Sequence, residues 1–215
     1  MEKDLAILIA DLSGYTALTE THGALSAADL IEGFIEIVEG SLVGDSRVCE
    51  RKGDEVMIIS DSADMLLGTG YAILQNSAGK VNFLQVHGAL HWGKILERNN
   101  HYFGHTLNVT ARIASRAKPG TFWCSDQFMH QLSKNTSFVL EPCGKHAFKN
   151  VSAETDLYEL SVGGNETFSI DPICRMIIHD KEGSIRHPDS PSIFFCSENC
   201  RKLYMEQERN QQAIK

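Results

Sequence analysis

The sequence predicts an α+β protein with a central mixed sheet, followed by a small metal-stapled module. The run LAILIADL (5–12) is apolar almost throughout, which is typical of a strand buried on both faces. Strand-like and helix-like stretches then alternate up to residue 162, and this alternation indicates one sheet with flanking helices. From Asp171 the composition changes, with three cysteines and two histidines within about thirty-five residues.

Hydrophobic periodicity and turn residues divide the first part of the chain into elements. Ser26 is a suitable N-cap for a helix, and Lys52-Gly53-Asp54 separates the two strands of a hairpin. Besides 5–12, the expected strands are 46–51, 55–60, 81–97, 121–125, 138–144, 145–151 and 156–162, and the expected helices are 26–42, 62–78, 105–117 and 126–134.

Composition and charge exclude several classes of protein. The 215 residues are 42% hydrophobic and 22% charged, which is ordinary for a globular protein. The net charge of −8 argues against nucleic acid as the main partner, because phosphate binding needs a basic surface. The acidic start is unlike a secretory signal, and no apolar run is long enough to span a bilayer. We therefore expect a cytoplasmic protein without a membrane partner.

Two acids and two helical residues form the first set of candidate site residues. Asp11 ends the first strand and Asp54 stands at the hairpin tip, and each alone is an ordinary turn or strand-end residue. Two carboxylates that converge from neighbouring strands, however, suit Mg²⁺ or Mn²⁺. Asn108 and Arg112 are four residues apart, so they share one face of the helix 105–117. An arginine there is suited to clamping a phosphate.

The stretches ILIADLSGYT, ERKGDEVMII, HGALHWGK and YFGHTLNVTARIASRAKPGTFWCS resemble, in order and spacing, the catalytic domain of class III nucleotidyl cyclases. FKNVSAETDLYEL resembles the closing segment of that family, so the resemblance covers about residues 4–162. It implies a ferredoxin-like central sheet of the βαββαβ type with flanking helices. It also implies conversion of ATP or GTP to a 3′,5′-cyclic nucleotide and pyrophosphate, in intracellular signalling.

The resemblance implies a role for each matching residue. Asp11 and Asp54 would hold two Mg²⁺ or Mn²⁺ ions, Asn108 would position the ribose, and Arg112 would stabilise charge on the reacting phosphate. The backbone that would lie against the triphosphate belongs to Leu12, Ser13, Gly14 and Tyr15. Because this family builds its site from both partners of a dimer, we expect a homodimer and an inactive lone protomer.

Base recognition is where the chain departs from the family pattern. Adenylyl cyclases have Lys and Asp at the positions of Glu50 and His101. A carboxylate can accept both guanine donors, N1–H and the exocyclic amine, so Glu50 is compatible with GTP. His101 matches neither branch of the family, although it could donate to guanine O6. The alternative is that base selection has decayed and that Glu50 is an exposed strand residue. Glu55, next to Asp54, is expected to be structural.

The cysteines of the last part predict a second metal site. Three thiolates suit tetrahedral Zn²⁺, or Cu⁺ in an open site. The ligands would be Cys174, Cys196 and Cys200, with His179, His187 or Asp171 as the fourth. DPICRM and IFFCSENC resemble YHS/TRASH-like metal-binding modules, although Arg175 stands where that family usually has Gly. The expected division is a domain at 1–162, a linker at 163–170, the metal module at 171–206 and a polar tail at 207–215.

Three functions are compatible with these patterns. The first is a homodimeric purine nucleotide cyclase whose C-terminal metal module regulates it. The second is a catalytically degenerate protein of the same fold that binds a nucleotide or responds to a metal. The third is a metal-trafficking protein in which the first domain serves only for dimerisation.

Overall fold

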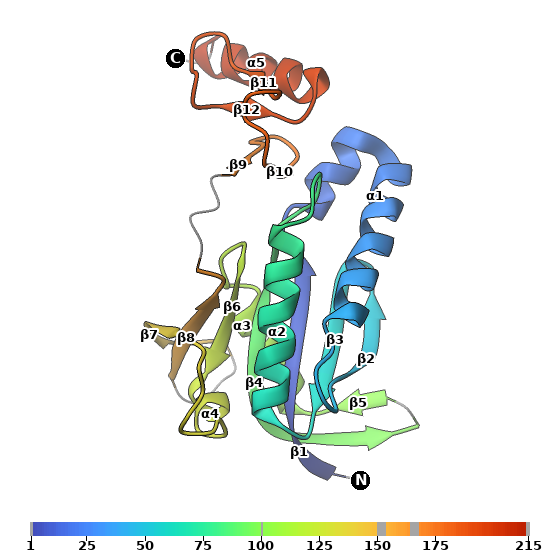
Figure 1. The fold of residues 1–215 in the computed structure, drawn as a ribbon, viewed down its shortest axis with the longest axis vertical. Helices are drawn as coiled ribbons and strands as arrows, with labels where there is room; N and C mark the ends of the chain where they lie inside the picture. Colours follow the sequence, from blue (N-terminus) through green and yellow to red (C-terminus); the bar gives the residue numbers. More distant parts are fainter. Residues whose placement is uncertain (1, 100, 150–153, 164–167, 214–215) are drawn as a thin grey trace.

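A computed structural model describes residues 2–99, 101–149, 154–163 and 168–213. Residues 2–163 are called the N-terminal part here, and residues 168–213 the C-terminal part. The N-terminal part is a mixed sheet flanked by helices, so the predicted α+β fold class is confirmed (Figure 1). The C-terminal part lies beyond one end of this sheet and carries a single long helix.

The sheet of the N-terminal part is almost entirely antiparallel. Its strand order is β2-β3-β1-β4-β6-β8-β7, with β5 paired to the outer end of β4, and only β4 and β6 run parallel. The strands are β1 (Glu2–Leu12), β2 (Arg47–Lys52), β3 (Glu55–Ser60), β4 (Val86–Arg98), β5 (His101–Phe103), β6 (Thr121–Ser125), β7 (Leu140–His146) and β8 (Thr155–Ser161).

Helices cover both faces of the sheet. The helices of the N-terminal part are α1 (Tyr15–Gly40), α2 (Ala63–Ala78), α3 (His105–Ala114) and the short α4 (Asp126–Met129). Phe34 of α1 and Leu66 of α2 belong to the hydrophobic cluster on one face. Val109 and Ile113 of α3 belong to the cluster on the other face. Each face of the sheet therefore has its own hydrophobic core.

Strand β1 is buried on both faces, as its sequence predicts. Alternate residues along a strand point to opposite faces. Ala6, Leu8 and Ala10 accordingly pack toward α1 and α2, whereas Ile7 and Ile9 pack toward α3. β3 lies on one side of β1 and β4 on the other, and both pair with it antiparallel. The end of β1 is thereby held in the middle of the sheet.

Helix α1 begins much earlier than the sequence predicts. It starts at Tyr15, with Gly14 as its N-cap in the left-handed conformation (φ 92°), so the predicted start at Ser26 is wrong. At Gly23 the backbone leaves helical geometry (φ 82°, ψ 172°), which divides α1 into a short first segment and a longer second one. Glycine takes such angles without the steric cost that a Cβ adds. The bend lies at the end of the molecule where the C-terminal part sits (Figure 1).

The hairpin expected at residues 138–151 is also different. A single strand, β7, runs from Leu140 to His146 and pairs with β8, with an irregularity in the register between Pro142 and Gly144. The expected turn between Gly144 and Lys145 is therefore part of the strand. Residues 150–153, which include part of the expected closing segment, lie outside the described residues.

The C-terminal part consists of short two-residue strands and one helix. These are β9 (Ser169–Ile170), β10 (Ile177–Ile178), β11 (Ile185–Arg186), β12 (Phe194–Phe195) and α5 (Glu198–Ala213). Its hydrophobic cluster has three buried members, Cys174, Phe195 and Cys200, which are too few for a large core. Met176 packs against both this cluster and the core under α1 and α2, and Ile177 N–H donates to the carbonyl of Phe83 (2.8 Å).

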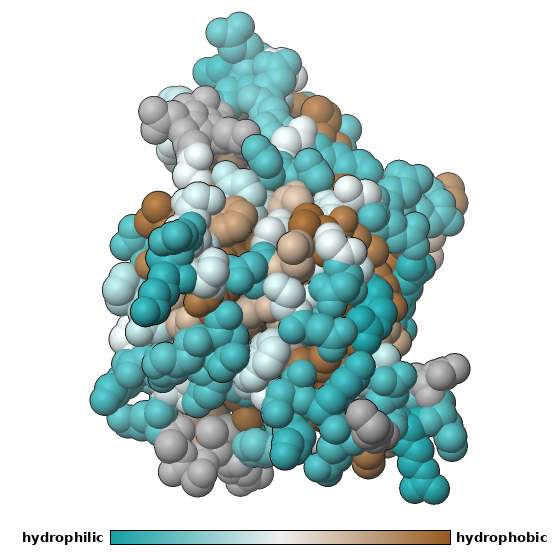
Figure 2. Space-filling view, turned by 60° about the horizontal axis from the view of Figure 1, so that its bottom comes forward, coloured by the Kyte–Doolittle hydropathy of each residue, from teal (hydrophilic) through white to brown (hydrophobic). Residues whose placement is uncertain are grey.

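The surface is predominantly polar. Figure 2 shows hydrophilic side chains over most of one face, with apolar ones in short patches between them. Among the described residues, no helix combines the length and the hydrophobicity needed to cross a bilayer.

The close approach of β1 and β4 gives a test of the sheet register. A Cβ atom at Gly88 would overlap the carbonyl oxygen of Ile9. We expect Gly88→Ala to lower the free energy of unfolding by about 3 kcal/mol or more, because the two strands would have to separate. The matched control is Gly40→Ala at the end of α1, where a Cβ meets nothing within 4 Å. The control should raise the stability by up to about 1 kcal/mol. Urea denaturation of both variants measures the difference, and equal effects would contradict this packing.

Candidate active site and metal cluster

Two carboxyl groups meet where β1 ends beside the β2–β3 turn. Asp11 is the next-to-last residue of β1, and the register pairs its neighbour Ala10 with Val56 near the start of β3. Asp54 precedes β3 in a turn that Gly53 closes with φ 63°. Burial raises the pKa of Asp11 to about 7, and the Asp54 charge together with a hydrogen bond to its carboxyl adds to this shift. The predicted pair is therefore brought together, in an arrangement that a divalent cation would stabilise.

The turn from Leu12 to Tyr15 leads directly from this pair into α1. The N–H of Leu12 donates to Asp11 Oδ1 (3.0 Å) and that of Ser13 to the carbonyl of Gln85 (2.8 Å), so neither is available to a phosphate. The first N–H groups of a helix have no partner inside it. In α1 these begin at Gly14 and Tyr15, because the first helical bond runs from Leu18 to Gly14. Half of the predicted phosphate contacts are thus helix N-terminal donors, which suit an anion.

His87 is a neighbour of Asp11 that was not among the predicted site residues. It lies directly opposite Asp11 in the β1–β4 register. Its Nδ1 is 2.8 Å from Ser13 Oγ, and its Nε2 is 3.9 Å from Asp11 Oδ2. Burial lowers the pKa of His87, so the neutral ring is favoured near neutral pH. The imidazole thus links Asp11, a predicted metal ligand, to Ser13 in the turn that is predicted to contact phosphate. His87 could be identified only from the register in which β1 and β4 pair, and not from a motif.

A second group of polar residues lies between β2, β3 and α3. A cavity of about 190 Å³ is lined by Glu50 and Asn108, together with Ile9, Lys52, Glu55, Met57, Leu107 and Ala111. Glu50 reaches it because of a bulge in β2. The register shifts between Val48 and Glu50, so that Glu50 stands opposite Met57 on the face that α3 covers. A bulge redirects side chains in this way. Glu55 lines the same cavity, and its structural role stays a prediction.

Arg112 follows Asn108 by one turn of α3 but does not line the cavity. Its side chain is half-buried, and its NH1 atom is buried without a hydrogen-bond partner among the described residues. A buried cationic donor without an acceptor is costly. Such a group is expected where an anion or a second protein chain supplies the missing acceptor.

His101 is not brought to the cavity. It is exposed on β5, paired with Arg98 in the register, and its ring lies 6.4 Å from that of Phe103. Of the two residues predicted to read the base, only Glu50 shares a cavity with Asn108. The role of His101 stays a prediction.

The three clustered cysteines of the C-terminal part converge. Cys174 Sγ is 3.4 Å from Cys196 Sγ, which is in turn 3.6 Å from Cys200 Sγ. A hydrogen bond with Cys174 and burial raise the pKa of Cys196, and burial raises that of Cys200 to about 12. The other cysteines are apart from this group: burial raises the pKa of Cys49 to about 12, and Cys124 is fully buried.

None of the three predicted fourth ligands completes this cluster; His22 of α1 does. His22 Nε2 is 3.5 Å from Cys196 Sγ and 3.6 Å from Cys200 Sγ. The ligand atoms of His22 and the three cysteines all lie within 4.8 Å of one another. No sequence pattern identifies this residue, because His22 and Cys196 are 174 positions apart.

The chain matches no family-level sequence model, but individual proteins are similar to it. It is 29% identical over 167 residues to an adenylate cyclase of Glutamicibacter nicotianae, covering 77% of this chain and 41% of that protein. The chain thus spans less than half the length of this relative.

Two solved structures show the same fold. Adenylate cyclase from Trypanosoma brucei aligns with a TM-score of 0.68 at 18% identity, covering 82% of this chain and 93% of that one. The guanylate cyclase domain of Catenaria anguillulae in complex with GTP aligns with a TM-score of 0.61 at 17% identity, covering 75% and 98%. The N-terminal part therefore has the fold of the adenylate/guanylate cyclase catalytic domain.

The carboxyl pair gives a pH-dependent prediction. Because the pKa of Asp11 is raised in the fold, its stabilising protonated form is present at pH 4 and is lost as the pH rises through about 7. We expect Asp11→Asn to raise the free energy of unfolding at pH 8 by about 1–2 kcal/mol, since solvent screens part of the charge. At pH 4 the two proteins should differ little.

Urea denaturation without added divalent cation measures this difference. Asp29→Asn, on an exposed position of α1, is the control for removal of one negative charge. A stability gain from Asp11→Asn that is the same at both pH values would show that the pKa of Asp11 is not raised in the fold.

Proposed function

We propose that the protein is a purine nucleoside triphosphate cyclase. The ribose 3′-oxygen attacks the α-phosphorus, a new O3′–P bond forms, and the bond from the α-phosphorus to the bridging oxygen of the β-phosphate breaks. The 3′-hydroxyl loses its proton, and the products are a 3′,5′-cyclic nucleotide and pyrophosphate. The cyclic nucleotide would serve in intracellular signalling.

One observation carries this proposal: the Asp11–Asp54 pair lies on the same face of the sheet as the cavity of Glu50 and Asn108. Ile9 lines that cavity, and Asp11 is two residues further along β1, so both point toward the α3 side. Ile9 and Asp11 are about 7 Å apart along β1. Two protomers that pack through this face would thus bring the carboxylates and helix N-terminal donors of one against the polar cavity of the other.

The donor set at the pair fits Mg²⁺ or Mn²⁺, because the two carboxyls are forced together and offer only oxygen ligands. Two such ions, when bound, would lower the pKa of the 3′-hydroxyl and offset charge on the phosphates. Neutral His87 holds Asp11 and Ser13 in position. The first N–H groups of α1 would bind the phosphate chain.

Asn108 and Arg112 act on the ribose and on the reacting phosphate. Asn108 is exposed on α3 and lines the cavity, where its amide would hydrogen-bond to the sugar. Arg112 would stabilise the charge that develops on the α-phosphate. The buried, unpartnered NH1 of Arg112 supports this role, because a bound phosphate supplies the acceptor that the described residues lack.

The functional unit is a homodimer in which one protomer supplies the carboxyl pair and the other supplies Asn108 and Arg112. The arm formed by the end of β4 and by β5 projects from the sheet (Figure 1), and Phe103 on it is 51% exposed. An exposed aromatic residue on a projecting arm is typical of a surface that a partner covers.

The cysteines of the C-terminal part would hold a separate cation. Cys174, Cys196 and Cys200 are soft ligands, so a zinc-class ion or Cu⁺ suits them and Mg²⁺ does not. This site has no atom in common with the Asp11–Asp54 pair, and we assign it no part in the phosphoryl chemistry.

Purified protein incubated with Mn²⁺ and ATP or GTP should yield a cyclic product, identified by mass. Asp54→Ala and Arg112→Ala should each lower the rate, the latter by about 10³-fold. Mixing the two variants should restore about a quarter of the wild-type activity, because half of the randomly formed dimers are mixed and each has one intact site.

A mixture of Asp54→Ala with Asp11→Ala is the matched control, because both changes damage the same half of the site. This mixture should stay inactive. Restoration in neither mixture would exclude a site shared between protomers. Nucleotide binding by calorimetry with no cyclic product from the wild-type protein would instead indicate a non-catalytic member of the fold.

Glu50 decides between the two bases. If its carboxylate accepts the two guanine donors, Glu50→Ala should lower kcat/KM for GTP by about 10- to 100-fold, the worth of a charged hydrogen-bonding partner. The value for ATP should change little, because adenine lacks this pair of donors. Leu107→Ala, in the same cavity without a polar group, controls for altered packing. Equal losses for both nucleotides would remove Glu50 from base selection.

A further inference from the structure

The cysteine cluster of the C-terminal part is completed by a side chain from the N-terminal part. We propose that Cys174, Cys196, Cys200 and His22 together form one tetrahedral site for a zinc-class cation, and that this site joins the two parts of the chain. The inference goes beyond the cyclase reaction and does not depend on it.

The distances fit such an ion. With Zn–S bonds of about 2.3 Å and Zn–N bonds of about 2.0–2.1 Å, a tetrahedron places sulfurs about 3.8 Å apart and sulfur and nitrogen about 3.6 Å apart. Cys196 Sγ lies 3.4 and 3.6 Å from the other two sulfurs, and His22 Nε2 lies 3.5 and 3.6 Å from two of them. Three sulfurs and one imidazole form a closed ligand set, which is typical of structural zinc.

The backbone of α1 presents His22 to this site. His22 is the last residue before the break at Gly23, so the short first segment of α1 ends with its imidazole facing the cysteines. Asn199 of α5 donates from Nδ2 to the carbonyl of Thr21 (3.4 Å), which ties the same segment to the helix that carries Cys200. The bend of α1 thus serves as a fixed support for the C-terminal part.

The three fourth ligands that the sequence suggested all lie outside the cluster. Asp171 is fully buried, and its carboxylate accepts the N–H groups of Ile173, Cys174 and Cys196 (2.8, 3.2 and 2.8 Å). Asp171 therefore orients the backbone at two of the ligands, Cys174 and Cys196, as outer-shell groups of metal sites do. The Nε2 atom of His187 lies 3.0 Å from Glu208. His179 stacks edge-on against Phe168, outside the cluster.

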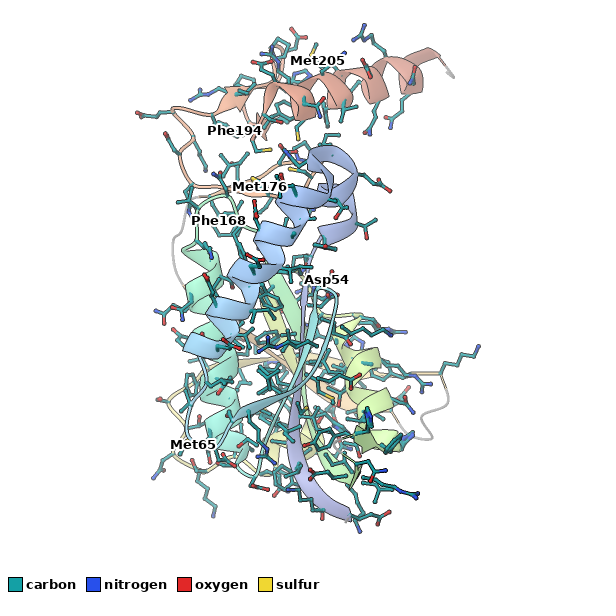
Figure 3. The ribbon with its side chains drawn as sticks, turned by 90° about the vertical axis from the view of Figure 1, so that its right-hand side faces the viewer. Asp54, Met65, Phe168, Met176, Phe194 and Met205 are labelled. Carbon is teal, nitrogen blue, oxygen red and sulfur yellow. The ribbon has the colours of Figure 1, made fainter. Side chains whose placement is uncertain are left out.

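The site also fixes Arg175 against the start of α1. Arg175 follows a ligand directly, and it takes a left-handed conformation (φ 67°), which is unfavourable for a residue with a side chain. A Cβ on Gly14 would lie 2.5 Å from Cβ and Cγ of Arg175. In Figure 3, Asp54 lies at the end of the sheet that faces the C-terminal part. A cation at the four ligands would hold this contact in place.

Titration of the full chain with Co²⁺ under anaerobic conditions tests the ligand set. The wild type should bind a single equivalent with the intense visible absorption of tetrahedral cobalt. His22→Ala should weaken binding by at least about 10- to 100-fold, since changes to outer-shell partners already cost that much. His22→Cys should restore tight binding with added sulfur-to-cobalt charge transfer, which shows that the loss is not a folding defect. His179→Ala, the matched control, should bind like the wild type.

Hydrogen exchange tests whether the site joins the two parts. Added Zn²⁺ should slow exchange both in peptides of residues 171–204 and in the first segment of α1. In His22→Ala the protection of α1 should disappear. Wild-type cobalt affinity and spectrum in His22→Ala, or Zn²⁺ protection confined to the C-terminal part of the wild type, would overturn the proposal.

Discussion

The pairing of β1 with β3 on one side and with β4 on the other is the constraint on which the N-terminal part depends. A strand that is apolar on both faces can be buried only between two layers of helices, and α1, α2 and α3 provide them. The same pairing fixes where β1 ends. Asp11 therefore lies beside the β2–β3 turn and opposite His87, and the next residues can begin α1 without a linker.

The polar end of the sheet contains two electrostatically unfavourable features. Asp11 and Asp54 repel each other, and Arg112 carries a buried donor without an acceptor among the described residues. Neither feature stabilises a metal-free, ligand-free protein. In the proposed function, both would become favourable once cations lie between the carboxylates and a phosphate meets the guanidinium. Such preorganised charge is what the chemistry of phosphoryl transfer requires.

The elements that local pattern governs could be predicted, and those that depend on one backbone irregularity could not. The unbroken apolar run of β1 and the Lys52-Gly53-Asp54 turn identified the centre of the sheet and its hairpin. The early start of α1 was missed because Gly14 and Gly23 suggest a loop, whereas one caps the helix and the other bends it. The side of the sheet to which Glu50 points depends on a bulge, and periodicity alone assigns no bulge. His22 required knowledge of the tertiary structure.

The contact between Gly14 and Arg175 bears on where the chain can be divided. A fragment that ends at residue 162, the natural boundary by composition, keeps the whole sheet but loses the three cysteines, Arg175 and Met176. In this fragment His22 would be exposed to solvent at the bend of α1, and the apolar residues that Met176 covers would also be exposed. Kinetic constants or nucleotide affinities measured on such a fragment would therefore describe a protein with an altered helix start, rather than an isolated copy of the same site.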